Sequence, residues 1–239
     1  MSARVELIAE VATNHGGSIE MAKEFIRQFA DAGADWIKFQ SFRVRHIRPD
    51  DPQKDWFGRC ELSEDAHYEL IAECRANNVR FLTTVYHADE VPFLARLGLE
   101  AIKIGSGEAG EEALAQAVIR ASFAHTFVAT GITRIHNTAV WNIAMAKRPY
   151  PPMIHGLRFL GCVTRYPAPL GLAAARFNAQ SGWATTGPQC LMTGWSDHAV
   201  GLSECFTAIE LGATIIEKHV KLDRQARPPR PWEASVAEF

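Results

Sequence analysis

The sequence predicts an α/β fold in which a parallel sheet closes into a barrel, and three observations lead to it. Apolar, β-rich segments alternate with segments of helical periodicity along most of the 239 residues, an order typical of a parallel sheet covered by helices. There are eight β-rich segments, the number that closes a TIM (β/α)8 barrel. The first is followed by "EVATNHGGS", without the GxGxxG turn common in the open, doubly wound alternative.

The predicted strands are short runs rich in Val, Ile, Phe and Trp. They cover residues 5–12, 36–42, 79–86, 101–106, 126–131, 157–163, 190–196 and 214–220. The last of them, "TIIEKHV", changes from apolar to charged within one run. This change indicates that the first part of the strand closes the barrel and that its carboxyl end reaches a polar site.

The predicted helices lie between these strands. The clearest covers residues 18–33, where Ser18 can act as N-cap, Phe25 and Phe29 recur at helical spacing, and Gly33 can end the helix. A second helix is predicted over residues 63–78, with Ser63 as N-cap and Leu70, Ile71 and Cys74 facing inward. Residues 88–98 and 201–213 follow the same plan, each with a glycine close to its end.

The chain is predicted to form a single domain over residues 1–239, because no low-complexity linker interrupts the alternation. Residues 224–239, which contain "RQARPPRP", are expected to form an irregular tail. Few helical residues follow the last strand, so the eighth covering helix is expected to be missing or truncated. A partner subunit or a rearranged segment would then cover that face, and we expect a homodimer or higher homo-oligomer.

Composition excludes several classes of function. The formal net charge of −2 gives no electrostatic case for nucleic acid or an anionic membrane as partner. No apolar run approaches the roughly 18 residues that span a bilayer, and "MSARVELIAE" has no apolar signal core. The five cysteines include no CxxC pair, which favours reduced thiols and a cytoplasmic protein.

Polar residues recur near the carboxyl ends of the predicted strands, and in a parallel barrel those ends meet at the face that holds the active site. Taken singly, each is more often structural than functional, but their recurrence on all eight strands points to a site. In chain order they are Glu10, Asn14, His15, Lys38, Gln40, Thr83, Thr84, Lys103, Ser106, Glu108, Thr130, Thr164, Tyr166, Ser196, Asp197, His198, Glu217, Lys218 and His219.

Two lysines among these residues indicate an anion site. An ammonium group directed into a barrel needs an anionic partner. Lys38 and Lys103, with the hydroxyls of Thr84 and Ser106, would form a cradle suited to a phosphorylated carboxylate.

Two histidines indicate a metal site. His198 and His219 are placed at the ends of neighbouring predicted strands, which lie about 4.8 Å apart in a sheet. Their imidazoles can therefore share one ion. Two histidines with oxygen ligands suit a divalent cation such as Mn, Fe, Co or Zn with open positions.

Several stretches resemble the sialic acid synthase (N-acetylneuraminate synthase) family. They are "IAEVATNHGGSIEMAKEFIRQFADAGADWIKFQSF", "FLTTVYHADEVPFLARLGLEAIKIGSGE", "YPAP" and "GWSDHAVG" with "GATIIEKHVKLD". They occur in the family's order from about Val5 to Asp223. The resemblance implies a TIM-barrel transferase that condenses phosphoenolpyruvate with an N-acylated amino-sugar aldehyde and releases phosphate.

The same resemblance implies roles for the strand-end residues. Those that would hold phosphoenolpyruvate are Lys38, Thr84, Lys103, Ser106 and Ser196. Those that would bind a divalent cation, typically Mn²⁺, are His198 and His219. Those that would line the sugar side or manage protons are Glu10, Gln40, Glu108, Tyr166 and Glu217. Either Glu10 or Glu217 could orient the attacking water, and the sequence leaves that choice open.

The chain departs from the family pattern on the sugar side. Ala129 stands where the family has a serine, Thr164 where it has Asn or Ser, and Arg230 where it has an aspartate. The family's C-terminal antifreeze-like domain is expected to be absent. Arg230, with Arg224 and Arg227, would either point to solvent or fold over the pocket and favour an anionic acceptor.

Three functional hypotheses follow. The first is a synthase of the sialic acid type, acting on phosphoenolpyruvate and an N-acetylmannosamine-like acceptor. The second is a related barrel enzyme that acts on a different aldehyde, with the altered tail shaping the pocket. The third is a degenerate barrel that binds a metabolite without turnover; the retained pair of His198 and His219 argues against it.

Overall fold

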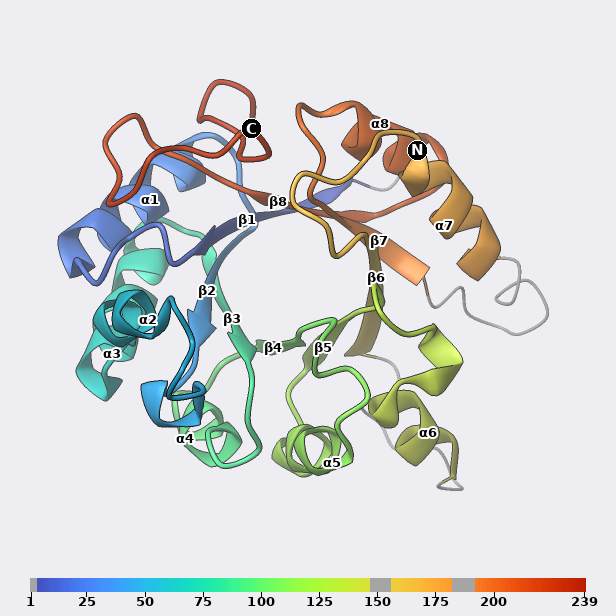
Figure 1. The fold of residues 1–239 in the computed structure, drawn as a ribbon, viewed down its shortest axis with the longest axis horizontal. Coiled ribbons are helices and arrows are strands. Elements are labelled where there is room, and N and C mark those ends of the chain that lie inside the picture. Colours follow the sequence, from blue (N-terminus) through green and yellow to red (C-terminus); the bar gives the residue numbers. More distant parts are fainter. Residues whose placement is uncertain (1–3, 147–155, 182–191) are drawn as a thin grey trace.

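The computed structural model describes residues 4–146, 156–181 and 192–239. Its strands form one closed barrel in chain order, each parallel to its neighbours, and the last pairs with the first. Helices surround the barrel on the outside (Figure 1). The predicted TIM-barrel fold is therefore confirmed. The first two residues of the strand predicted over 190–196 lie outside the described residues.

The observed strands lie within one or two residues of their predicted bounds. They are β1 (Glu6–Ala12), β2 (Trp36–Ser41), β3 (Arg80–Val85), β4 (Ala101–Ile104), β5 (His125–Ala129), β6 (Leu157–Cys162), β7 (Met192–Asp197) and β8 (Ile215–His219). The helices are α1 (Ile19–Asp31), α2 (Lys54–Cys60), α3 (Glu64–Ala76), α4 (Val91–Arg96), α5 (Glu112–Ala121), α6 (Ala139–Ala146), α7 (Leu172–Ser181) and α8 (Ser203–Glu210), with short 3-10 turns η1 (Val44–His46) and η2 (Ile135–Asn137). The sequence analysis missed α2 and η1, which lie in the long connection after β2.

Helix ends follow the local sequence. The Ser18 side chain accepts a hydrogen bond from the backbone N–H of Met21 at the start of α1, and Ser63 caps α3 in the same way. After α1, Gly33 adopts a φ of +100°, a left-handed conformation that glycine tolerates best. These caps fix where α1 and α3 begin, so that their apolar sides face the barrel.

An apolar layer fills the lower part of the barrel. It consists of one buried side chain from each of seven strands: Ile8, Trp36, Leu82, Ala101, Phe127, Leu160 and Ile215. The rings of Trp36 and Phe127 meet edge to face with centroids 5.6 Å apart. The barrel interior at this level is thus a packed core, and any cavity must lie above it, toward the carboxyl ends of the strands.

The tail after β8 covers part of the barrel's outer face. Residues 220–239 are all described and contain no helix. Backbone hydrogen bonds tie Ala234 to His219 (2.8 Å) and to Lys221 (2.9 Å), and the Phe239 ring packs on Phe29 of α1 at 5.3 Å. Figure 1 shows the tail beside α1, outside β1 and β8. A rearranged segment therefore covers the face that lacks a helix, while the homo-oligomer remains a prediction.

Two further observations bear on the class of protein. Within the described residues, no helix is both long and apolar enough to cross a membrane. The cysteines that the structure describes, Cys60, Cys74, Cys162 and Cys205, are all buried and unpaired.

Candidate active site

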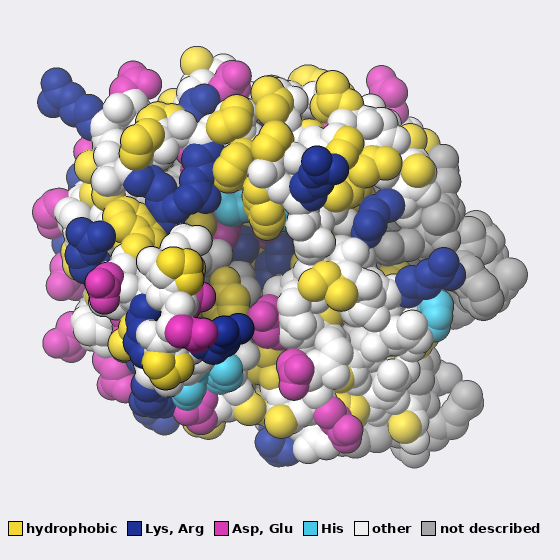
Figure 2. Space-filling view, viewed as in Figure 1, with side chains coloured by type: hydrophobic (Ala, Val, Ile, Leu, Met, Phe, Trp, Pro, Cys, Tyr) yellow, Lys and Arg dark blue, Asp and Glu magenta, His cyan; other side chains and the backbone are white. Residues whose placement is uncertain are grey.

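A polar layer lies directly above the apolar layer, two residues further along the strands. Because side chains alternate faces along a strand, residues two apart point to the same side, so Glu10 follows Ile8 inward and Lys38 follows Trp36. The layer lines a cavity of about 260 Å³. Figure 2 shows the hollow near the middle of the molecule, with basic and histidine side chains inside it.

The structure brings every residue with an assigned role to this one cavity: Glu10, Lys38, Gln40, Thr84, Lys103, Ser106, Glu108, Thr164, Tyr166, Ser196, His198, Glu217 and His219. The other strand-end residues, Asn14, His15, Thr83, Thr130, Asp197 and Lys218, do not line it. The strand register explains their proximity: Glu10 pairs with Lys38 across β1 and β2, and Thr84 with Lys103 across β3 and β4. Which of these groups bind or react remains a prediction.

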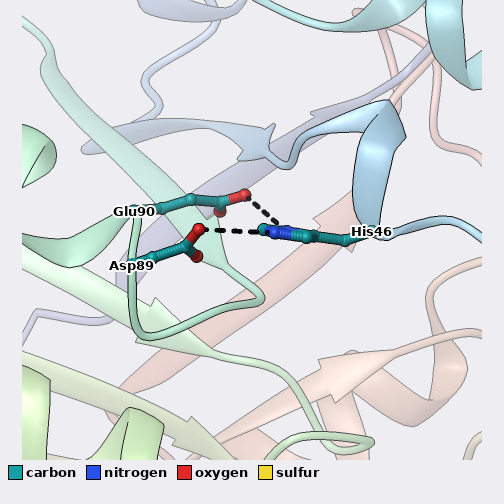
Figure 3. Close-up of side chains that lie close together, drawn as sticks. All are labelled: His46, Asp89 and Glu90. Carbon is teal, nitrogen blue, oxygen red and sulfur yellow. Dashed lines mark ion pairs between the residues drawn. The ribbon is translucent and has the colours of Figure 1, made fainter.

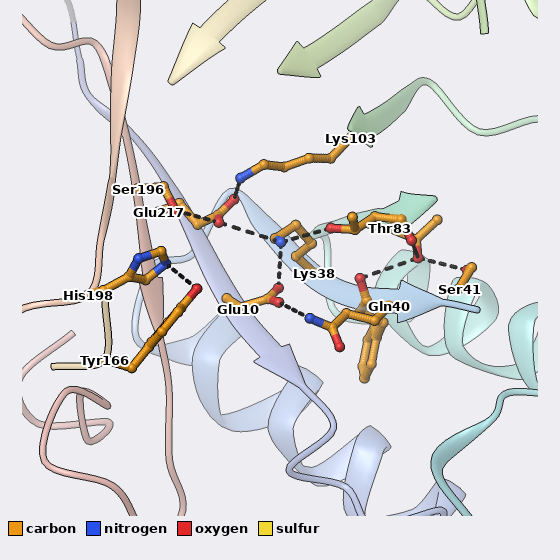
Figure 4. A network of polar contacts seen from close by, with 12 residues as sticks. Glu10, Lys38, Gln40, Ser41, Thr83, Lys103, Tyr166, Ser196, His198 and Glu217 are labelled. Atoms are coloured by element: carbon orange, nitrogen blue, oxygen red, sulfur yellow. Dashed lines mark hydrogen bonds and ion pairs between the residues drawn. The ribbon is translucent and has the colours of Figure 1, made fainter. Parts of the chain in front are cut away.

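Lys38 is the centre of the first half of the polar network (Figure 4). Its Nζ lies 2.9 Å from Glu10 Oε2, 3.5 Å from Glu217 Oε1, and donates to Thr84 Oγ1 at 3.0 Å. Gln40 Nε2 donates to the other oxygen of Glu10 at 3.3 Å. The cradle lysine is therefore held by carboxylates of the site itself.

Glu217 is the centre of the second half. It accepts hydrogen bonds from Lys103 Nζ at 2.6 Å and from Ser196 Oγ at 2.8 Å. The two lysines and the two glutamates are all at least 96% buried. Such charges are stable in the interior only while they remain paired, so any anion that enters must exchange partners with Glu10 or Glu217.

The pKa values of the two buried carboxyl groups are shifted in opposite directions. Burial, aided by the nearby Glu217 charge, raises the pKa of Glu10 to about 7, although Lys38 opposes the shift. Burial would also raise the pKa of Glu217, but Lys103 and Lys38 outweigh it and hold this pKa well below its usual value. Burial lowers the pKa of Lys103, while the two glutamates overcome burial and raise that of Lys38.

The two histidines lie side by side at the ends of β7 and β8. Their ring centroids are 5.4 Å apart, a spacing that allows both rings to reach one ion. The Nδ1 of His198 is 2.7 Å from the Val163 carbonyl oxygen, so Nδ1 carries the proton and Nε2 keeps its lone pair. Burial lowers the pKa of His198 to about 4 and that of His219 well below its usual value. Two neutral rings, with the tautomer of His198 fixed by its hydrogen bond, fit a metal-binding pair.

Alternation also explains which strand-end residues stay out of the cavity. Asp197 and Lys218 lie between inward residues and point to the outer side, where Lys218 Nζ pairs with Asp197 and donates to the Ala199 carbonyl at 2.6 Å. This ion pair is as buried as the inward ones. The charged end of β8 therefore serves two purposes: Glu217 and His219 form the site, and Lys218 fastens the loop after β7.

The loop after β4 completes the wall of the cavity. Ser106 Oγ accepts hydrogen bonds from the backbone N–H groups of Gly131 (2.9 Å) and Ile132 (2.8 Å). A side chain at position 131 would come within 2.8 Å of that oxygen, so the close approach requires glycine. Burial raises the pKa of Glu108 on the same wall.

Sequence reasoning missed two side chains that line the cavity, besides the backbone of Gly105 and Gly107. Tyr86 follows β3 and Cys162 ends β6, and both line the cavity. Burial raises the pKa of the Tyr86 hydroxyl well above its usual value. A polar-residue search could have found Tyr86, because it lies two positions after Thr84 on the inward face. Cys162 carries no such signal.

The basic tail lies at the rim of the cavity. Arg230 lies over the Trp232 ring at 5.3 Å, and that ring is 5.6 Å from Tyr166, whose hydroxyl is 3.1 Å from His198 Nε2. Arg227 stacks on Trp56 at 4.4 Å. Among the described residues, no arginine lines the cavity itself. The tail thus buttresses the wall instead of projecting freely or entering the pocket.

Comparison with known proteins identifies the family. A model described as the NeuB family matches residues 25–235. The chain belongs to the NeuB family. Its resemblance to the sialic acid synthases is thereby confirmed, and it extends over nearly the whole chain.

Relatives of this NeuB-family chain include synthases of different acids. N,N'-diacetyllegionaminic acid synthase of Campylobacter jejuni is 30% identical over 93% of this chain and 69% of that protein. N-acetylneuraminate-9-phosphate synthase of Mus musculus is 26% identical over 91% of this chain and 62% of its own length. The chain spans about two thirds of these relatives, and they differ in their products.

Solved structures of low identity share the fold. An N-acetylneuraminic acid synthetase from Leptospira borgpetersenii, in complex with citrate, has a TM-score of 0.84 at 24% identity and covers 98% of this chain and 80% of its own. A truncated 3-deoxy-D-arabino-heptulosonate 7-phosphate synthase from Thermotoga maritima has a TM-score of 0.67 at 12% identity, covering 98% and 82%. Both are consistent with the barrel described above.

Proposed function

We propose that this chain condenses phosphoenolpyruvate with an N-acylated amino-sugar aldehyde, N-acetylmannosamine-like in structure, to form a nonulosonic acid and phosphate. The observation that carries the proposal is the polar layer, in which two buried lysines, two buried glutamates and two adjacent histidines share one cavity. Cavities at the carboxyl end of a barrel are where TIM-barrel enzymes react.

The charge balance of the cavity supports a metal ion as cofactor. The described lining residues include the lysines Lys38 and Lys103 but also three glutamates, Glu10, Glu108 and Glu217. A phosphorylated carboxylate brings further negative charge, so its binding needs an additional cation. A divalent ion, most simply Mn²⁺, held by His198 and His219 would supply that charge and Lewis acidity toward the aldehyde.

The residues of the chain have distinct tasks in this reaction. Lys38 and Lys103 neutralise the phosphate and carboxylate of phosphoenolpyruvate, while the hydroxyls of Thr84, Ser106 and Ser196 orient them. The methylene carbon of phosphoenolpyruvate bonds to the aldehyde carbon, and the aldehyde oxygen takes up a proton. The former enol carbon then takes up water, which loses a proton, and the tetrahedral intermediate expels phosphate to leave a 2-keto acid.

Glu10 is the better placed of the two buried glutamates to accept the proton of the attacking water. Glu217 already accepts hydrogen bonds from Lys103 and Ser196 and forms an ion pair with Lys38. It would therefore hold the lysines in position. The Oε2 of Glu10 has only its ion pair with Lys38. Glu10→Gln should therefore lower kcat more than it changes KM, whereas Glu217→Gln should weaken phosphoenolpyruvate binding.

The acceptor would bind at the outer end of the cavity, where Gln40, Glu108, Thr164 and Tyr166 offer polar groups. The relatives named above are synthases of different sugar acids, so the family leaves the choice of acceptor open. The half-buried aromatic and basic rim formed by Trp232 and Arg230 belongs to the same end of the cavity. This rim favours a second candidate function, in which the enzyme acts on a different aldehyde acceptor.

The test is phosphate release from phosphoenolpyruvate in the presence of Mn²⁺, measured with a panel of N-acylated amino-sugar aldehydes. The panel contains N-acetylmannosamine and its 6-phosphate, and formation of a 2-keto acid is measured in parallel. Equal amounts of phosphate and keto acid with one acceptor would support the proposal. Binding of phosphoenolpyruvate without phosphate release from any panel member would instead favour a barrel that has lost turnover.

A further inference from the structure

A second group of metal-ligating side chains lies on the same face of the barrel, outside the cavity. His46 belongs to the turn η1 after β2, and Asp89 and Glu90 belong to the turn between β3 and α4. Figure 3 shows the imidazole of His46 directed between the two carboxylates. We call these three residues the rim cluster. They are separate from the cavity, although Tyr86 in the same β3–α4 connection lines it.

The spacing within the rim cluster is that of ligands around one ion. His46 Nδ1 lies 3.5 Å from Glu90 Oε1, and the other ring nitrogen, Nε2, lies 3.3 Å from Asp89 Oδ2. An imidazole binds a given ion through one nitrogen only, so the distance from Nδ1 to Glu90 is the one that bears on a shared ion. One ligand atom from each residue can be chosen so that all lie within 4.8 Å of one another. Two ligands bound at about 2.1 Å in a tetrahedral site lie about 3.4 Å apart, whereas a good hydrogen bond is shorter.

Glu90 gives the independent reason to expect a cation. Only 5% of the residue is exposed, yet neither carboxylate oxygen has a hydrogen-bond partner, and the same holds for the facing Nδ1 of His46. Glu90 occupies the N-cap position of α4 but its side chain makes no capping hydrogen bond. A buried carboxylate that makes no hydrogen bond to the free backbone N–H groups at the start of its helix destabilises the fold unless another group or ion binds it.

The surroundings of the cluster are mixed in charge. Arg45 pairs with Asp89 at 2.7 Å and donates from Nε to His46 Nε2 at 3.2 Å, so Nδ1 of His46 is the nitrogen left for an ion. The ring of His87 lies beside that of His46, with centroids 3.9 Å apart, on the exposed side of the cluster. It is the nearest candidate for a fourth ligand.

We propose that His46, Asp89 and Glu90 bind a second divalent transition-metal ion, with Zn²⁺ as the first candidate. One imidazole and two carboxylates are a donor set that suits Zn²⁺, Co²⁺ or Mn²⁺. The ion would join the connection after β2 to the connection after β3 at the mouth of the cavity and would restrain the segment that carries Tyr86. This site does not rest on the proposed synthase activity.

The competing explanation is an ion-pair cluster in which a protonated His46 bridges the two carboxylates. The two explanations differ in the response to added metal. The full-length protein, stripped with a chelator, is titrated with Zn²⁺ by calorimetry and with Co²⁺ by visible absorption, without any substrate. The variants are His46→Ala and the conservative Glu90→Gln, and His198→Ala/His219→Ala removes the other candidate site.

The matched control is His125→Ala. His125 also lies 3.5 Å from a glutamate, Glu100, but at the opposite end of the barrel. We expect the double histidine variant to bind one Zn²⁺ per chain. Removing either His46 or Glu90 should weaken that binding by more than about 100-fold, since even groups that only orient a ligand contribute about 10- to 100-fold.

Loss of His125 should leave the Zn²⁺ affinity unchanged. The His46→Ala variant should bind one equivalent of metal fewer than wild type. The His198→Ala/His219→Ala variant should still bind that equivalent. The proposal is overturned if the double histidine variant binds no stoichiometric metal, or if His46→Ala and Glu90→Gln bind as tightly as their parent. A Zn²⁺-dependent rise in Tm that Glu90→Gln abolishes would support it even where His46→Ala folds poorly.

Discussion

Two layers of side chains fill the same barrel, two residues apart on the same strands, and they differ completely in chemistry. The lower layer, with Trp36 and Phe127 at its centre, is apolar and tightly packed. The upper layer contains Lys38, Lys103 and Glu217, whose charges are equally buried and are paired with one another and with neighbouring polar groups of the same layer. The lower layer stabilises the fold, whereas the upper layer holds paired charges that a ligand can exchange.

Burial alone does not distinguish the core of this barrel from its site. Ile8 and Glu10 are both almost fully buried, and both point into the barrel. They differ in whether their contacts can be exchanged for others without loss of stability. Removing an apolar group leaves a void, whereas an entering anion can replace a carboxylate as partner of a lysine.

A large-to-small substitution in the lower layer should change stability more than any other substitution considered below. Trp36→Ala should reduce the free energy of unfolding by about 3–5 kcal/mol, because it empties the space against Phe127 and removes the hydrogen bond to Glu6. Urea denaturation measures the change. Ile8→Val, which removes one methylene from the same layer, should cost only about 0.5–1.5 kcal/mol. Equal losses in the two variants would contradict the layered description.

The next effect comes from the upper layer. Lys103→Ala should weaken phosphoenolpyruvate binding about 100- to 1000-fold, the range typical of a lost charge-stabilising donor, while Glu217 retains Lys38 and Ser196. Calorimetry measures the affinity and circular dichroism the fold. Lys23→Ala, which removes the same charge from the surface of α1, is the control. Unchanged affinity in Lys103→Ala would rule out the anion cradle.

His15 is a buried polar residue that belongs to neither layer. It is 1% exposed, and burial lowers its pKa to about 4. Below pH 6.5 the unfolded state therefore binds a proton that the folded state does not, so stability falls as the pH drops toward 4. Between pH 7 and pH 5 this histidine should remove about 2 kcal/mol.

The measurement for His15 is urea unfolding at both pH values in wild type and His15→Gln. The variant should lose less stability on acidification than wild type does, because glutamine does not titrate. Parallel losses in the two proteins would show that His15 is not the acid-sensitive group.

The smallest effect concerns Ala129, the upper-layer residue of β5. It lines the cavity with a methyl group where the family has a serine. Ala129→Ser would add one hydroxyl donor, and a net hydrogen bond contributes about 0.5–1.5 kcal/mol. Phosphoenolpyruvate affinity should therefore rise by about 2- to 10-fold. A fall in affinity would show that the cavity is shaped around the alanine.

Much of this arrangement could be predicted from the sequence because it follows from periodicity. The alternation in "TIIEKHV" already separates Glu217 and His219 from Lys218, and the caps Ser18 and Ser63 mark the starts of α1 and α3. The short α2 was missed because one turn or two of helix carries too little periodic signal. Cys162 was missed because a lone apolar thiol resembles any other core residue.

The tail shows the limit of sequence reasoning most clearly. Its arginines were expected either to point to solvent or to fold over the pocket. Arg224 is exposed, whereas Arg227 and Arg230 are half-buried and lie on Trp56 and Trp232. Those contacts join segments that have no common periodicity. Only the folded chain brings them together.

The eight β-rich segments and their two-residue period predicted the closed barrel and most of the polar side chains that face the cavity, because eight repeated units leave few alternatives. The tertiary structure decided which charges pair, since the partners of Lys38 come from three different strands. It also decided how the tail covers the barrel and that His46 meets Glu90 at the rim. Pairing energies depend on distances between segments far apart in the chain, and local patterns carry no information about them.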